Sequence, residues 1–253
     1  MAQIFHQSMD RLRRRVVQLS AAVEQQVAAA VRAVHERDPQ AAREAIEADA
    51  AVNRDEQEIE EECLHLLALH QPVAFDLRML TSMVKMTGRL ERMGNLAVDV
   101  AELAELLLQH PAARSIPFDL DTMSRTTREM LRMSLDALLE LDVRLAEEVR
   151  ELDDVVDDIH RGMYPAVCEA IRADPERGEV LILLMGVSRK LERIADYACG
   201  IAKEVMYLAS GEIVRHDKPG DARPTDAGEA TQPDTNREDP SFHPRRGGGS
   251  WNS

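Results

Sequence analysis

The segment Leu90-Glu91-Arg92-Met93-Gly94-Asn95-Leu96-Ala97 has a counterpart later in the chain, Leu191-Glu192-Arg193-Ile194-Ala195-Asp196-Tyr197-Ala198. Each copy lies in a stretch whose apolar residues recur with helical spacing, and each has an acid at its second position. The second copy has another acid one helical turn later, where the first copy has an amide. A repeat of this kind predicts a fold made of two similar halves.

Apolar residues recur every three to four positions in six long segments, which predicts six helices. In the first half the helices span about residues 5–37, 38–69 and 73–108. In the second half they begin at Asp119 or Asp121, at Asp142 and at Asp174, and Gly211 is placed to end the last one. The predicted fold class is therefore all-α, a tandem repeat of two antiparallel three-helix bundles, residues 1–112 and 118–215.

The remaining residues, 216–253, have a different composition. Prolines and glycines are frequent there and alternate with charged residues. Such a segment buries too little apolar surface to offset the entropy of ordering it, so this C-terminal tail is predicted to be disordered.

Charge and hydropathy narrow the functional classes. The formal net charge of −15 repels the phosphate backbone of nucleic acids, and no basic arm is visible, so no nucleic-acid partner is expected. The longest apolar run, residues 180–187, is too short to span a bilayer, and the N-terminus lacks a signal-peptide core. We expect a cytoplasmic protein whose three cysteines are free buried thiols.

Acidic residues border the predicted core of the last two helices. Glu192 and Asp196 lie about 100° around the helix from the apolar stripe, and Asp153 and Asp157 have the same position on the preceding helix. In one of the two possible bundle hands these borders converge, and the sequence does not fix the hand. If they converge, the four carboxylates form a site suited to hard, oxygen-binding metals.

The first half repeats this arrangement with less charge. Asp49 and Asn53 flank the core on the second helix, and Glu91 and Asn95 flank it on the third. The two amides are neutral oxygen donors, which predicts a weaker metal site.

Two other interpretations use the same residues. The carboxylates can be solvated border charges, several of them paired with Arg92, Arg189, Lys190 or Arg193. Alternatively, the pairs Glu62–His65 and Asp157–His160 have the spacing of di-iron ligands, although they lie in different bundles at non-matching positions. No phosphate loop, nucleophile elbow or His-Glu-x-x-His motif is present, so neither catalysis nor an organic cofactor is expected.

Several segments resemble the PhoU family of phosphate-uptake regulators over about residues 5–215. They are the doubled Leu-Glu-Arg motif and residues 60–64, 66–69, 71–78 and 207–212. The resemblance implies two three-helix bundles, a homodimer, and surface clusters of iron, zinc, magnesium or manganese. It assigns Asp153, Asp157, Glu192 and Asp196 to one cluster, and Asp49, Asn53, Glu91 and Asn95 to the other. Asn95, Arg89 and Lys190 depart from the usual family pattern, which weakens the first cluster.

The resemblance also implies a function without catalysis. A PhoU-like protein is a negative regulator of phosphate uptake and of the phosphate-starvation response. Its partners are the phosphate ABC transporter, through the ATPase subunit, and a sensor histidine kinase, and it meets the membrane only through them. Two alternatives remain open, namely a metal-storage or metal-dependent enzyme and a scaffold or chaperone for a different transporter.

Overall fold

The computed structural model describes residues 2–111 and 116–211, and these residues form six α-helices and no strand. The first half contains α1 (Ala2–His35), α2 (Pro39–His70) and α3 (Ala74–Leu108). The second half contains α4 (Leu120–Glu140), α5 (Val143–Ala173), the short 3₁₀ helix η1 (Pro175–Arg177) and α6 (Gly178–Ser210). The all-α prediction with three long helices per half is confirmed, whereas the predicted tail, residues 216–253, lies outside the described residues.

Aspartates begin three of these helices. Asp38 accepts a hydrogen bond from Gln40 N at 2.8 Å, Asp119 accepts one from Thr122 N at 3.0 Å, and Asp142 accepts one from Leu145 N at 3.1 Å. Each carboxylate satisfies a backbone N–H that has no partner within the helix. The last helix, α6, ends at Ser210, and Gly211 caps it with a φ of 76°. These predicted boundaries are therefore confirmed.

The predicted start of the sixth helix at Asp174 is wrong. Asp174 caps η1, in which Arg177 N bonds to Asp174 O at 3.2 Å, and α6 begins only at Gly178. This bond reaches three residues back instead of four, so the chain makes a tighter turn before the α-helix starts. The first helix also ends earlier than predicted, at His35, because Arg37 has a φ of 53° and cannot continue it.

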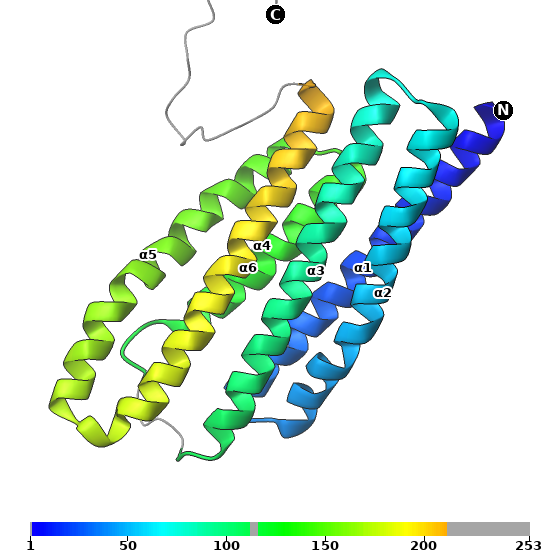
Figure 1. The fold of residues 1–253 in the computed structure, drawn as a ribbon. Helices are drawn as coiled ribbons and strands as arrows, with labels where there is room; N and C mark the ends of the chain where they lie inside the picture. The colour runs from blue at the N-terminus through cyan, green and yellow to red at the C-terminus, as the bar shows by residue number, and fades with distance from the viewer. Residues whose placement is uncertain (1, 112–115, 212–253) are drawn as a thin grey trace, which may run out of the picture. The chain divides into compact units, whose positions relative to one another are not determined.

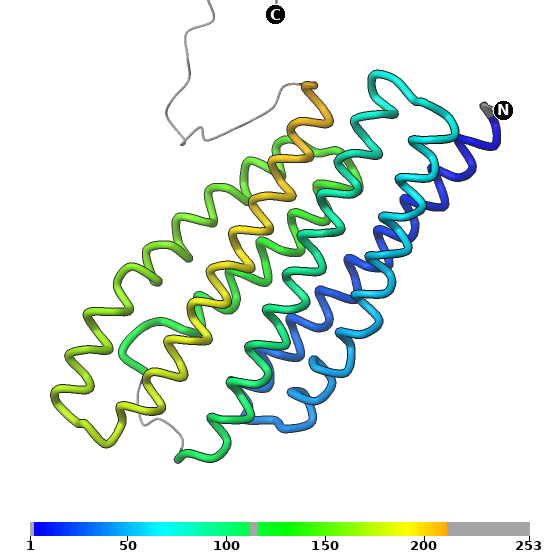
Figure 2. Tube along the Cα trace, in the orientation of Figure 1, coloured from blue at the N-terminus to red at the C-terminus, as the bar shows by residue number. Residues whose placement is uncertain are grey.

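All six helices pack into one compact unit. In the ribbon and in the tube view, α3 runs alongside α6, with α2 on one side of this pair and α5 on the other (Figure 1; Figure 2). One continuous apolar core extends through both halves and includes Leu12 and Leu90 from the first half and Met130 and Leu191 from the second. The two repeats therefore share a core.

The α3–α6 contact is antiparallel and nearly symmetric. Near one end Lys85 of α3 meets Glu204 of α6, and near the other end Lys190 of α6 pairs with Asp99 of α3. In the register that matches the two Leu-Glu-Arg motifs, Arg89 corresponds to Lys190 and Asp99 to Gly200, and Arg89 lies against Gly200 as Lys190 lies against Asp99. The repeats thus face each other through an approximate two-fold axis, which places both Leu-Glu-Arg motifs at the centre of the molecule's helical unit.

Candidate functional site

The second predicted metal site lies between α5 and α6. Val156 on α5 and Leu191 on α6 are fully buried, so Asp157 and Glu192, which follow them, lie at the border of the core. Asp153 and Glu192 are half-buried, while Asp196 is exposed. The carboxylates therefore occupy the border position that the helical spacing predicts.

The structure brings these four carboxyl groups close enough to repel each other. Burial, reinforced by the charges of Asp157 and Asp196, raises the pKa of Asp153 to about 6. Burial and then Asp196 raise the pKa of Glu192, and burial and then Asp157 raise that of Asp196. The bundle hand left open by the sequence is thus the one in which the two borders converge.

Two neighbours of this site were not assigned to it from the sequence. Cys199 lies beside Asp153, and burial followed by the charge of Asp153 raises the pKa of the thiol, so it stays protonated at neutral pH. His160 lies near Glu192 and offsets part of the rise in pKa that burial and Asp196 cause there, while the His160 Nδ1 atom is buried without a hydrogen-bond partner among the described residues. The sequence signal for His160 was its position one helical turn after Asp157 on α5.

The first site lies between α2 and α3, and its amides are bonded to its carboxylates. Asn53 Nδ2 donates to Asp49 Oδ2 at 2.8 Å, and Asn95 Nδ2 donates to Glu91 Oε1 at 2.5 Å. The other oxygens of the first pair, Asp49 Oδ1 and Asn53 Oδ1, are buried and have no hydrogen-bond partner in the described part of the chain. Unpaired buried oxygens are costly, so the site has acceptors to offer to a cation.

Glu56 extends the first site along α2. Burial, then the charge of Glu60 and then that of Glu91 on α3 raise the pKa of Glu56, so its carboxyl group lies within electrostatic range of the first site. Glu56 was not predicted to belong to this site, although it lies one helical turn beyond Asn53. The matching position in the second repeat is His160, so the two sites differ in charge and also in the type of donor.

The donor chemistry of both sites suits a metal ion, but the donors are not yet gathered around one point. Within residues 2–111 and 116–211, no three His, Cys, Asp or Glu side chains are grouped closely enough to hold an ion. Hard cations prefer carboxylate and amide oxygens, and a cation relieves the repulsion that raises these pKa values. Binding at either site therefore requires side-chain rotation.

The alternative in which the border acids pair with nearby bases accounts for little of this arrangement. Lys190 pairs with Asp99, and none of the four second-site carboxylates forms an ion pair within 4 Å among the described residues. Arg193 lies close enough to act on the pKa of Glu192 and of Asp196. Its lowering effect is smaller than the raising effects of burial and of the neighbouring acids.

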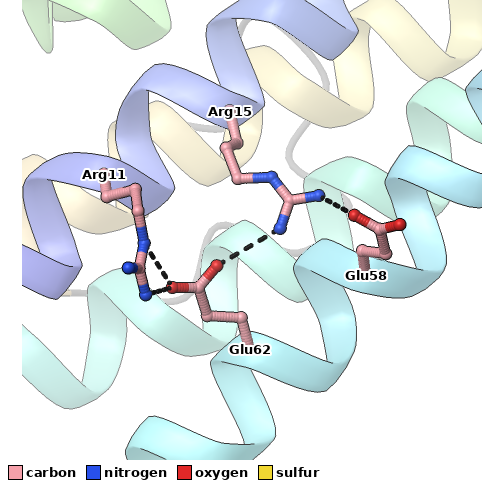
Figure 3. Close-up of polar contacts among 4 residues, drawn as sticks. All are labelled: Arg11, Arg15, Glu58 and Glu62. Atoms are coloured by element: carbon pink, nitrogen blue, oxygen red, sulfur yellow. Dashed lines mark hydrogen bonds and ion pairs between the residues drawn. The ribbon is translucent and has the colours of Figure 1, made fainter.

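The di-iron interpretation is contradicted by the positions of its ligands. Arg11 and Arg15 of α1 bind both oxygens of Glu62, and Arg15 also bonds to Glu58 at 2.6 Å (Figure 3). In the part of the chain that the structure describes, α2 and α5 do not contact each other. The pair Glu62–His65 therefore cannot share a metal with Asp157–His160.

A second polar cluster, absent from the sequence prediction, joins the two repeats. Glu204 of α6 is only 8% exposed and accepts a hydrogen bond from Ser82 Oγ at 3.1 Å. Lys85 Nζ lies 3.3 Å from its carboxylate and Arg89 Nη1 lies 3.4 Å from it. The corresponding residue of the first repeat is Leu103, which packs near Gly186, so the repeat pattern gave no sign of a charge at this position.

The hydropathy of the helices shows whether any of them could span a membrane. Among the described helices, none combines the length and the apolar character required to cross a bilayer.

The match to a known protein family has the same two-fold repeat as the sequence. The family model described as PhoU domain matches the chain twice, over residues 16–104 and residues 120–205. The first match covers most of α1–α3, and the second covers most of α4–α6.

Similar proteins cover nearly the whole helical part. The phosphate-specific transport system accessory protein PhoU homolog of Aquifex aeolicus (strain VF5) is 32% identical over 209 residues, which is 82% of this chain and 94% of that protein. The homolog of Synechocystis sp. (strain ATCC 27184 / PCC 6803 / Kazusa) is 34% identical over 209 residues, 82% of this chain and 92% of its own length. The crystal structure of PhoU from Pseudomonas aeruginosa matches with a TM-score of 0.80 at 31% identity and covers 82% of this chain and 100% of that one.

Proposed function

The chain belongs to the PhoU family, and from this premise we propose that it is an accessory protein of a phosphate-specific transport system. The observation that carries the proposal is the double match to the PhoU domain, combined with the names of relatives that align over most of both chains. The shared helical fold supports the same proposal.

In this proposal the protein restrains phosphate uptake and the phosphate-starvation response under phosphate-replete conditions. It works in the cytoplasm, as a homodimer, through contacts with the ATPase subunit of a phosphate ABC transporter and with a sensor histidine kinase. The net charge of −15 supports control through protein contacts, because an acidic surface disfavours direct binding to DNA.

Metal binding is the second part of the proposal. Asp153, Asp157, Glu192 and Asp196 hold one cation site, and Asp49, Asn53, Glu91 and Asn95 hold the other. A bound cation supplies positive charge that neutralises the mutual repulsion of these carboxylates. Iron, zinc, magnesium and manganese all accept such ligands. The unpaired oxygens of Asp49 and Asn53 favour this assignment over a purely solvated border.

Two measurements test these statements separately. Tagged protein from phosphate-replete cells should co-purify with the transporter ATPase and the kinase, and recovery of neither contradicts the accessory role. Elemental analysis of the purified protein should find metal that is lost in Asp196→Ala and Glu192→Ala. If both variants keep the full metal content, the second site does not hold it.

The same variants address the alternative of a metal-dependent enzyme or storage protein. If regulation of phosphate uptake survives complete loss of metal, the cation sites have a structural or separate role. If uptake is insensitive to deletion of the gene, a scaffold for a different transporter becomes the better account.

A further inference from the structure

A hollow of about 270 Å³ lies between α1 and α4 and above α3. We call it the α1–α4 groove. Its floor consists of Met79, Met83 and Met86 of α3, and its walls include Val17 of α1 and Leu139 of α4. The groove is distinct from both carboxylate sites, which lie on α2 and α3 and on α5 and α6.

The course of the two wall helices explains why this groove is open. His35, near the end of α1, lies 2.9 Å from Asp121 Oδ1 and 3.0 Å from Ser124 Oγ, near the start of α4. The helices are antiparallel, so the later residues of α4 meet the earlier residues of α1. Because α4 ends at Glu140, it stops while α1 still continues along α3.

The lining is apolar, and its walls remain accessible. Leu139 is 55% exposed and Val17 is 36% exposed, whereas the three methionines beneath them are at most 4% exposed. Apolar side chains gathered around an open hollow are typical of binding surfaces. Methionine is flexible and adapts its shape to different apolar groups, which suits a docking floor.

Charged residues give the groove two different ends. Arg13 lies at the end away from His35, and Glu24 and Asp136 lie toward the His35 end. Neither Glu24 nor Asp136 forms an ion pair within the described residues, so their charges are available to a partner. A partner with a basic group at this end and an acidic group near Arg13 is electrostatically complementary to the groove.

The dimensions of the groove match a helix better than a broad protein face. From Arg13 to Glu24 the α1 wall rises about 16 Å, or roughly three helical turns. Over that span one amphipathic helix presents apolar side chains at positions i, i+4 and i+7. A stable interface between two globular surfaces needs about 800 Å² from each partner, which the groove alone does not provide.

We propose that the α1–α4 groove docks an amphipathic helix of the phosphate transporter, with apolar residues on the methionine floor and a lysine or arginine opposite Glu24 and Asp136. This inference rests on the proposed accessory function. It assigns a surface to that function, and the surface is separate from the cation sites.

The test measures binding of the full chain to its own detergent-solubilised phosphate transporter by biolayer interferometry. Leu139→Glu and Val17→Glu place a charge on the exposed walls, and both should weaken binding about tenfold or more. Leu64→Glu is the matched control, because Leu64 of α2 is 54% exposed and lies away from the groove. Its affinity should stay close to that of the unmodified chain.

Asp136→Lys provides a second measurement at an exposed position of α4. It should weaken binding, because it removes a negative charge and places a positive one opposite the basic group of the partner. Thermal unfolding of each variant verifies that the fold is intact.

The outcomes separate the two levels of the proposal. If the unmodified chain does not bind the transporter, both the accessory function and the groove assignment are overturned. If the unmodified chain binds and all three groove variants bind equally well, only the groove assignment is overturned. A change of oligomeric state in Leu139→Glu, measured by light scattering, shows that the groove holds a second copy and also overturns it.

Discussion

Lys85 of α3 and Glu204 of α6 form an ion pair at 3.3 Å, across the boundary between the two repeats. Glu204 is buried, and Ser82 and Arg89 complete its set of partners. Because a buried carboxylate needs such partners to remain charged, the cluster fixes how the two halves meet. The two-fold arrangement is broken here, since the equivalent position in the first repeat is Leu103.

Glu204→Gln should destabilise the chain by about 1–3 kcal/mol, because Lys85 and Arg89 lose a buried charged partner. The effect is smaller than for a fully enclosed pair, since Lys85 is half exposed and can be solvated. Urea denaturation measures the free energy of unfolding. Glu105→Gln on the exposed face of α3 should change it by less than about 0.5 kcal/mol, and equal effects of both variants would count against this role for Glu204.

Two glycines of α3 should respond to alanine in opposite directions. An added Cβ at Gly88 meets nothing within 4 Å, so Gly88→Ala should stabilise the chain by about 0.5–1 kcal/mol through helix propensity. An added Cβ at Gly94 lies 2.9 Å from Gln26 Oε1 and 3.2 Å from Val52 Cγ1, so Gly94→Ala should destabilise it by about 1–3 kcal/mol. Thermal and urea unfolding compare the pair directly, and the same sign for both refutes the proposed close packing at Gly94.

Asp153 should make the metal-free protein less stable as pH rises. Its pKa is raised from 3.8 to about 6 in the folded state, so between these values the folded chain binds more protons than the unfolded chain. Stability from this group is therefore present at lower pH and is lost as pH rises through about 6. Asp153→Asn removes that loss, and it should raise the melting temperature more at pH 7 than at pH 4.5.

The control for this pH dependence is Asp154→Asn, which changes an exposed neighbour on α5. Its effect on the melting temperature should be nearly the same at both pH values. A gain for Asp153→Asn that does not grow with pH contradicts the electrostatic account of the second site.

Restoring charge to the first site should strengthen its affinity for cations. In the double variant Asn53→Asp with Asn95→Asp, two more carboxylates should raise Mn²⁺ affinity by about tenfold, since affinity at oxygen sites follows ligand charge. The same change should lower the stability of the metal-free protein. Asp49 and Glu91 then lose the amide groups that donate to them and face additional negative charges instead. Equilibrium dialysis with elemental analysis measures the first effect. Gln25→Glu on the exposed side of α1 is the matched control and should alter neither quantity.

The local features of the fold could be predicted from the sequence because they depend on residues a few positions apart in the chain. The Asp38-Pro39 pair starts α2 as predicted, since a cap needs only an acid and the next few backbone groups. The similar Asp174-Pro175 pair starts a 3₁₀ turn instead. Its first bond closes over three residues and α6 begins at Gly178, a choice that the shared Asp-Pro signal does not decide.

The candidate sites could be predicted only in part from the sequence. Helical spacing placed Asp153, Asp157, Glu192 and Asp196 at the core border, but the hand of the bundle decided whether they converge. Contacts between distant segments were not encoded in any periodicity, which is why the Glu204 cluster and the α1–α4 groove emerged only from the structure. The amide–carboxylate bonds of the first site likewise depend on rotamers and not on spacing.

We propose that this chain restrains the phosphate-starvation response. Alkaline phosphatase activity in phosphate-replete cells that lack the chain tests it most directly. We expect high activity in the deletion strain and a return to the repressed level when the full chain is supplied again. Activity that stays repressed after deletion would contradict the claim.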